Sequence, residues 1–169
     1  MSETPRESAA GKGTGGTAGG GDGLRPLTPD DLARVVAIDR VLSGRSRRGF
    51  YETRLAAALR EPDAFVYLGV TRGGELAGFV FARLLEGEFG IREPVAVLDA
   101  IGVDAAHRGS GLGRTLMSGL EDILRRKGVA RLRSQLDWNN HALMRFLDAA
   151  GFRLAPRIVL RRPTAGAAF

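Results

Sequence analysis

The segment AAHRGSGLGRTL, residues 105–116, is the centre around which this sequence is organised. A nearly continuous apolar run, 95–103, precedes it, and a helical pattern of apolar residues, 112–127, begins within it. A strand, a short glycine-rich turn and a helix are therefore predicted in this order. Gly109, Gly111 and Gly113 have no Cβ, so their amides can approach a ligand closely. The first amides of a helix lack intrahelical partners and lie at the positive end of its dipole, which favours a phosphate or pyrophosphate here.

Two common phosphate-binding motifs do not fit this segment. A Walker loop requires G-x-x-x-x-G-K-[ST], but Arg114 stands in place of its lysine and Arg108 in place of its first glycine. A dinucleotide fingerprint requires G-x-G-x-x-G, whereas the glycines here recur at every second position. The spacing that fits is [RQ]-x-x-G-x-[GA], with Arg108, Gly111 and Gly113 at its fixed positions. The alternative is a tight strand-to-helix turn that binds no ligand.

The pattern [RQ]-x-x-G-x-[GA] resembles the acetyl-CoA signature of the GNAT superfamily of N-acetyltransferases, whose loop amides hold the CoA pyrophosphate. A second segment, 140–152, resembles the family pattern N-x-x-A-x-x-x-Y-x-x-x-G-F, with Asn140 and Gly151-Phe152 matching. Leu143 replaces the usual alanine and Leu147 replaces the tyrosine, which in many members protonates the departing CoA thiolate. Another group or water must then supply that proton; Tyr51, Tyr67 and His141 remain, and each is expected to be structural.

Composition limits the classes of function. The chain has 169 residues, the size of one domain, and no cysteine, so disulfides and a cysteine nucleophile are excluded. With two histidines we expect no metal site, and with no long apolar run or signal peptide we expect a cytoplasmic protein without a membrane span. The net charge of +6 favours anionic ligands such as CoA. This positive charge reflects a composition that is rich in arginine throughout the chain, and no motif indicates nucleic-acid binding.

The chain divides into a flexible glycine-rich tail over 1–23, a domain over 24–162 and a frayed end over 163–169. The predicted elements of the domain are a strand at 24–27, helices at 28–41 and 50–60, strands at 65–71, 76–85 and 95–103, a helix at 112–127, a strand at 130–136, a helix that Asn139 or Asn140 caps and that ends before Gly151, and one or two strands between 152 and 161. The order β-α-α-β-β-β-α-β-α-β is that of the GNAT fold, an α/β (α+β) class with a mixed, mostly antiparallel sheet flanked by helices.

The resemblance implies where acetyl-CoA binds. The strand before the glycine loop should separate from its neighbour after Asp99, so that free backbone groups near Ile101 and Val103 bind pantetheine and polarise the thioester carbonyl. Asn140 binds CoA, caps its helix, or does both. The residues expected to bind acetyl-CoA are Ile101, Val103, Arg108, Gly109, Ser110, Gly111, Leu112, Gly113, Arg114 and Asn140.

Asp99 is the ionisable residue inside the apolar strand and the candidate general base. Burial raises the pKa of an unpaired carboxylate, and a pKa near neutrality suits a base. The alternative is a carboxylate held by backbone amides or by an arginine. Glu86, Glu88 and Glu93 are rival bases. The basic segment 45–48 lies in a region that commonly lines the acceptor side in this family; the alternative is a solvated run of charges.

The predicted function is acetyl-CoA-dependent N-acetyltransfer by direct attack of a primary amine. We expect the acceptor to be a protein lysine or an N-terminal amine. A small amine such as a polyamine, an amino acid or an antibiotic is the alternative, and a non-catalytic acetyl-CoA sensor is a second. The protein is expected to be a monomer or a homodimer, with no nucleic-acid or membrane partner.

Overall fold

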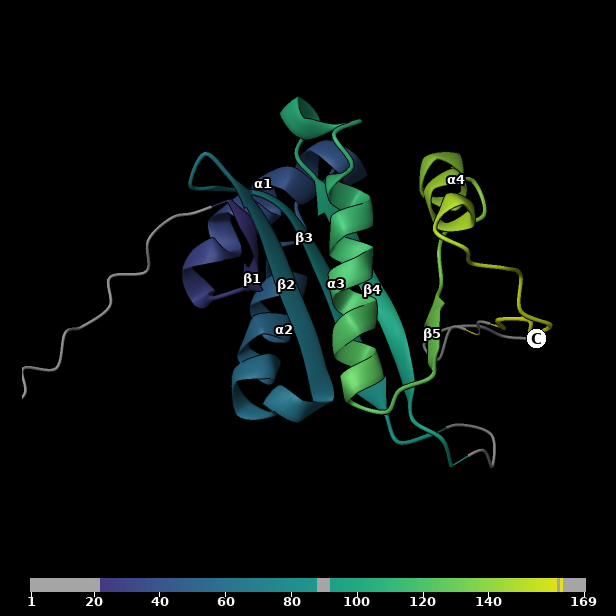
Figure 1. The fold of residues 1–169 in the computed structure, drawn as a ribbon. Helices are drawn as coiled ribbons and strands as arrows, with labels where there is room; N and C mark the ends of the chain where they lie inside the picture. The colour runs from purple at the N-terminus through teal and green to yellow at the C-terminus, as the bar shows by residue number, and fades with distance from the viewer. Residues whose placement is uncertain (1–21, 88–91, 161, 163–169) are drawn as a thin grey trace, which may run out of the picture.

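The computed structural model describes residues 22–87, 92–160 and 162. Within these residues the chain forms five strands and four α-helices in one α/β arrangement (Figure 1). The strands are β1 (Gly23–Pro26), β2 (Phe65–Arg72), β3 (Glu75–Leu85), β4 (Val95–Val103) and β5 (Arg131–Ser134). The helices are α1 (Leu32–Ser43), α2 (Arg48–Arg60), α3 (Leu112–Arg126) and α4 (His141–Ala149), with short 3-10 turns at Pro29–Asp31, Pro62–Ala64 and Ala105–His107.

The five strands form one sheet in the order β1-β2-β3-β4-β5. Neighbours from β1 to β4 pair antiparallel, and β4 pairs parallel with β5 because α3 carries the chain back across the sheet. Helices α1 and α2 cover one face and α3 covers the other, while α4 lies beyond α3 on the β5 side (Figure 1). The predicted fold class, a mixed and mostly antiparallel sheet flanked by helices, is confirmed.

Each face of the sheet has its own apolar core. Helix α3 places leucines at intervals of four residues, Leu112, Leu116, Leu120 and Leu124, so one stripe of the helix packs against the sheet. The other face is aromatic: Tyr51 of α2, Tyr67, Phe79 and Phe81 pack with the buried side of α1. The two layers hold β4 between them, which explains its nearly continuous apolar sequence.

Strand β4 contains a bulge at Asp99. Ala100 pairs with Phe81 and Leu98 with Ala82, so Asp99 has no opposite residue on β3. Leu98 and Ile101 consequently both face the α3 core, although three positions separate them, and Ala100 faces the aromatic core. An extra residue in a strand redirects the side chains around it. The bulge therefore turns Asp99 out of the normal alternation at the point where the strand enters the site.

One expectation for the end of the domain is wrong. The sequence predicts one or two strands between 152 and 161, but residues 152–160 form no strand. Leu154, Ile158, Val159 and Leu160 are apolar and yet strongly exposed. Their composition favours a strand, but a strand is stable only when it pairs with a neighbour, and this segment does not pair with β5. The described element order therefore ends with α4.

The folded chain begins slightly before the predicted end of the tail at residue 23. β1 begins at Gly23, and the carboxylate of Asp22 accepts a hydrogen bond from the Gly73 amide at 2.6 Å in the β2–β3 turn. Asp22 and Gly23 thus belong with the sheet. Residues 1–21 and 163–169, and the rival base Glu88, lie outside the described residues.

Candidate functional site

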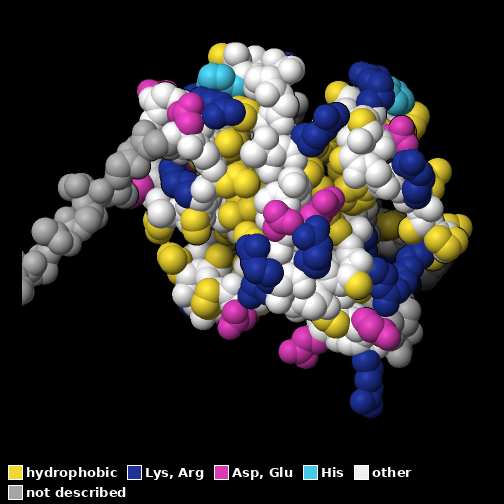
Figure 2. All heavy atoms as spheres, viewed as in Figure 1, with side chains coloured by type: hydrophobic (Ala, Val, Ile, Leu, Met, Phe, Trp, Pro, Cys, Tyr) yellow, Lys and Arg dark blue, Asp and Glu magenta, His cyan; other side chains and the backbone are white. Residues whose placement is uncertain are grey.

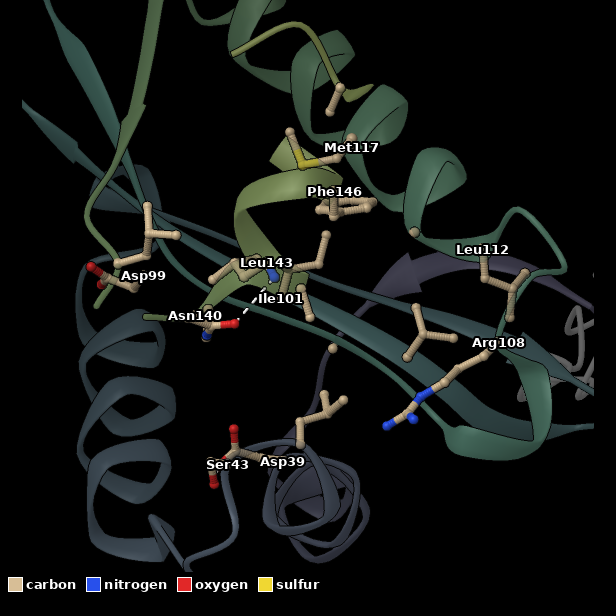
Figure 3. A pocket seen from close by; sticks show the side chains of 18 of the residues that line it. Asp39, Ser43, Asp99, Ile101, Arg108, Leu112, Met117, Asn140, Leu143 and Phe146 are labelled. Carbon is tan, nitrogen blue, oxygen red and sulfur yellow. Dashed lines mark hydrogen bonds between the residues drawn. The ribbon is translucent and has the colours of Figure 1, made fainter. Parts of the chain in front are cut away.

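A cavity of about 1770 Å³ opens where β4, α3, α4 and the end of α1 meet (Figure 3). Its walls come from the glycine loop with the first turns of α3, from the segment between β5 and α4 with α4 itself, and from the end of α1 with the α1–α2 connection. Figure 2 shows the hollow between α3 and α4, with apolar side chains inside it and basic side chains at its rim. β4 runs through the middle, and Asp99, Ala100, Ile101, Gly102 and Val103 all line the cavity.

The cavity exists because β4 and β5 separate. Their parallel pairing ends at Leu98 and Ser134, where the Ser134 hydroxyl donates to the Leu98 carbonyl at 3.2 Å. The separation expected at Asp99 is therefore present. Beyond this point the β5-facing edge of β4 has no strand partner among the described residues. Backbone groups on this edge need other partners, which an extended polar ligand can provide.

The turn that leads into the glycine loop is held in place by Asp104. The Asp104 carboxylate accepts from the Ala106 amide at 2.8 Å and from Arg34 of α1 at 2.7 Å, which fixes the turn before the loop. Gly109 and Gly111 have φ values of +77° and +83°, in the left-handed region that favours glycine. Nothing lies within 4 Å of the position where a Cβ would stand on either residue, so this side of the loop is open.

The third glycine has a different role. A Cβ on Gly113 would lie 2.9 Å from the ring of Phe146, so Gly113 allows α4 to pack closely against the start of α3.

The Ser110 hydroxyl is not free to bind a ligand, because it donates to the His107 carbonyl at 2.6 Å. Arg108 and Arg114 line the cavity, and Arg108 reaches into it (Figure 3). The positive end of the α3 dipole and these two cations thus lie on the same part of the cavity lining, an arrangement whose chemistry suits an anion.

Helix α4 contributes the far wall. Asn140 caps it, since its side-chain oxygen accepts from the Leu143 amide at 3.1 Å, and Asn140 also lines the cavity (Figure 3). Leu147, at the position of the family's tyrosine, is 4% exposed and packs in the α3 core. Its neighbour Phe146 lines the cavity instead. The α4 wall is therefore apolar here, and it lacks the tyrosine hydroxyl that the family pattern places at position 147.

Asp99 lies between two arginines. Its Oδ1 is 3.1 Å from Arg83 Nε, its Oδ2 is 3.4 Å from Arg54 Nη2, and its side chain is 9% exposed. Oδ2 is buried and accepts no hydrogen bond from the described residues. The Tyr67 hydroxyl is also buried without a hydrogen bond there, and burial raises the pKa of Tyr67 above its ordinary value. The rival bases Glu86 and Glu93 are exposed and do not line the cavity.

Asp39 lines the cavity although it was not among the residues predicted from the sequence. This α1 residue is 3% exposed, lines the cavity and forms an ion pair with Arg47. Arg47 also donates to the Tyr51 hydroxyl at 3.0 Å and lies over the rings of Phe50 and Tyr51. The available signal was an acid four residues after Val35, on the apolar stripe of a helix, where a charge requires a partner.

The basic segment is not a single unit. Arg47 is held on Asp39, and Arg48 forms a surface ion pair with Glu52 at 2.7 Å, one turn along α2. Arg45 is exposed and lines the cavity. The structure thus separates Arg48, which lies on the surface, from Arg45 and Arg47, which both line the cavity, with only Arg47 of these two held by an acidic partner.

The described residues contain no group of three or more His, Cys, Asp or Glu that could hold a metal ion. They also contain no helix that combines the length and the apolar character needed to cross a membrane.

Comparison with known proteins identifies the family. Residues 35–152 match the sequence profile of the Acetyltransferase (GNAT) family. The chain belongs to the GNAT family. This match covers the glycine loop, the separated strands and α4, and all of the cavity-lining residues except Val159 lie within it.

Two curated relatives of this GNAT domain carry different names. A mycothiol acetyltransferase from Sanguibacter keddieii is 31% identical over 150 residues, which cover 85% of this chain and 48% of that protein. The chain thus spans about half the length of that relative. A ribosomal protein bS18 alanine N-acetyltransferase from Escherichia coli is 29% identical over 98 residues, which cover 58% of this chain and 62% of that protein.

Solved structures share the fold of this GNAT domain. An aminoglycoside antibiotic 6′-N-acetyltransferase from Acinetobacter haemolyticus superimposes with a TM-score of 0.72 at 17% identity, covering 85% of this chain and 99% of that chain. A related enzyme, solved with a bisubstrate analogue of CoA and acetylneamine, gives 0.71 at 18% identity, covering 84% and 97%. Identities this low establish the fold alone.

Proposed function

We propose that this GNAT domain, over residues 24–162, is an acetyl-CoA-dependent N-acetyltransferase that acts by direct attack of a primary amine. One observation supports this most strongly: the unpaired edge of β4 and the open glycine loop at the start of α3 line the same cavity. A thioester that carries a long polar arm and a pyrophosphate needs a strand edge to bind the arm and a loop of amides to bind the pyrophosphate. Acetyl-CoA would supply an activated acetyl group there.

The cavity offers a binding surface for each part of acetyl-CoA. We infer that the pyrophosphate lies on the loop amides and near Arg108 and Arg114, because helix N-termini and guanidinium groups bind anionic phosphates. The pantetheine arm lies along the free edge of β4, at Ile101 and Val103, and Asn140 borders it from α4. The complete proposed set is Ile101, Val103, Arg108, Gly109, Ser110, Gly111, Leu112, Gly113, Arg114 and Asn140, with Ser110 acting through its backbone.

The proposed reaction is balanced without a covalent enzyme intermediate. The neutral amine nitrogen bonds to the acetyl carbonyl carbon as the carbon–sulfur bond breaks, the amine loses one proton, and the CoA sulfur gains one. Asp99 is the proposed base, because this residue lines the cavity and its Oδ2 accepts no hydrogen bond from the described residues. To act, the buried carboxylate would exchange its ion pairs with Arg83 and Arg54 for a proton of the docked ammonium group, received through water and then passed to solvent. Since Leu147 is apolar and buried, we infer that water protonates the thiolate.

We propose a protein amine, either a lysine or an N-terminal amine, as the acceptor. The name of the bS18 alanine N-acetyltransferase supports a protein acceptor, whereas the names of the aminoglycoside and mycothiol enzymes support a small one. Thiol release from acetyl-CoA tests the reaction, with peptide and small-amine acceptors compared at equal concentration. Amine-dependent release supports an acetyltransferase. Acetyl-CoA binding without release from any amine indicates a sensor.

A further inference from the structure

The α1–α2 side of the cavity has a distinct charge pattern. Asp39, Ser43, Arg45 and Arg47 line it from α1 and the connection to α2, and Asp99 of β4 lines the same cavity with its carboxylate paired to Arg83 and Arg54. The glycine loop and α3 lie on the other face of the sheet, so this side is left for the acceptor once the loop holds the pyrophosphate. The cavity's two other carboxylates, Glu121 and Asp137, come from α3 and from the segment before α4.

Both carboxylates on this side are already paired. Asp39 forms its ion pair with Arg47, whose Nε also donates to it at 2.9 Å. Asp99 pairs with both Arg83 and Arg54. Asp39, Asp99 and the arginines at 45, 47, 54 and 83 form one charged cluster, in which four guanidinium groups outnumber two carboxylates. The excess positive charge opposes a polycation and favours an anion.

Arg45 is the cation of this cluster that is available to a ligand. Its side chain is exposed and lines the cavity, and its hydrogen bonds with the Ser43 hydroxyl are made by its backbone amide and carbonyl. Arg48, three residues later, is also exposed but pairs with Glu52 on α2 and does not line the cavity. The chain therefore offers a matched pair of arginines, one facing the site and one facing away from it.

We propose that Arg45 selects acceptors that carry a carboxylate close to the reacting amine, and that polycationic amines are poor acceptors. This inference rests on the proposed acetyltransferase function and narrows its acceptor class. A guanidinium donates paired hydrogen bonds to a carboxylate, and the neutralised Asp39 and Asp99 leave nothing on this side to hold a second ammonium group. An N-terminal amine followed by an acidic residue fits this site.

The test compares two peptides with identical lengths and N-terminal alanines, with aspartate or asparagine as the second residue, and adds spermidine as a polycation. The unaltered protein should acetylate the aspartate peptide with a kcat/KM about tenfold higher than the asparagine peptide, the scale of one charge-assisted hydrogen bond. Spermidine should be poorer than either. Arg45→Gln should bring the ratio of kcat/KM for the aspartate peptide to kcat/KM for the asparagine peptide close to one. Arg45→Glu should invert this ratio, and Arg48→Gln should leave it unchanged.

Three results would overturn the inference: no preference in the unaltered protein, a preference for spermidine, or a higher KM for acetyl-CoA in Arg45→Gln, which would place Arg45 on the cofactor. Calorimetry of the same peptides with the CoA-loaded protein separates this inference from the acetyltransferase proposal. If no amine is acetylated, stronger binding of the aspartate peptide that is lost in Arg45→Gln still supports recognition. Equal binding of the two peptides contradicts it.

Discussion

Arg34 Nη2 lies 2.7 Å from Asp104 Oδ2, so a helix on one face of the sheet holds the residue that begins the turn before the glycine loop. The same guanidinium donates through Nε to the Leu76 carbonyl at 3.0 Å, which anchors it to β3. Asp104 in turn accepts from the Ala106 amide. Through these contacts α1 supports the loop that we propose binds pyrophosphate.

Replacing Arg34 by Met should raise the KM for acetyl-CoA more than it changes kcat. The loop loses a support, but no reacting group is removed. Because the arginine side chain is 40% exposed, the ion pair contributes only about 1 kcal/mol, equivalent to a Tm decrease of about 2–4 °C. Steady-state kinetics and thermal melting measure both effects. Arg125→Gln, which breaks a surface pair within α3, is the control, and an equal rise in KM in that variant would contradict the role of Arg34.

Substitution of Gly111 should impair CoA binding, whereas substitution of Gly113 should impair stability. Gly111→Glu places a negative charge on the open side of the loop and should abolish CoA binding, with only about 1–2 kcal/mol lost to the left-handed backbone. Calorimetry with CoA, on a variant whose circular dichroism is unchanged, measures this. Full affinity in a folded Gly111→Glu protein would refute the loop assignment.

Gly113→Ala should instead lower stability by about 1–3 kcal/mol, because the new methyl group meets the Phe146 ring. The smaller side chain of Phe146→Leu should restore much of this loss in the double variant. Urea unfolding of the two single variants and the double variant gives the coupling between the sites. Additive losses would show that the contact between α3 and α4 does not limit this position.

Asp99→Asn should reduce kcat by about 10²–10⁴, the range for a general base, while CoA affinity is retained. The loss should shrink as pH rises, since a lysine amine has a pKa of about 10.4 and then loses its proton unaided. Rates from pH 7 to 10 test this. Near-normal kcat at pH 7 would move the base elsewhere. Loss of folding would show that the carboxylate serves to neutralise Arg54 and Arg83.

The two tyrosines should respond oppositely to removal of their hydroxyls. Tyr67→Phe removes a buried hydroxyl that has no hydrogen bond among the described residues, so stability at pH 7 should stay the same or increase by about 1 kcal/mol. Tyr51→Phe removes the acceptor of the Arg47 hydrogen bond at 3.0 Å and should cost about 1–3 kcal/mol. Urea unfolding distinguishes them, and a larger loss for Tyr67→Phe would contradict the structure.

Alkaline pH should destabilise the fold through the same residues. Burial raises the pKa of both tyrosines, so the unfolded chain releases their protons first as pH rises. Their contribution to stability is therefore complete below the ordinary tyrosine pKa of about 10 and is lost above it. The free energy of unfolding should fall more steeply above pH 10 in the unaltered protein than in Tyr67→Phe. Equal slopes would contradict the buried environment of Tyr67.

The sequence by itself determined the centre of the protein. The apolar run of β4, the glycines at 109 and 111 and the four-residue spacing of the α3 leucines are local signals, so the bounds of β4 and the start of α3 match the prediction. Asn140 was readable as a cap for the same reason, because a cap bonds to an amide only three residues away. The glycine spacing also indicated the family that residues 35–152 confirm.

Only the tertiary structure decided which charges face one another. Asp99 meets Arg54 and Arg83, and Asp39 meets Arg47, through packing of α2, β3 and α1 that no spacing in the sequence encodes. The same dependence on distant partners explains the segment 152–160, whose apolar residues predicted a strand that pairing did not provide. Local propensity sets which elements can form, but the energy of a strand, a bulge or an ion pair depends on what the fold places opposite it.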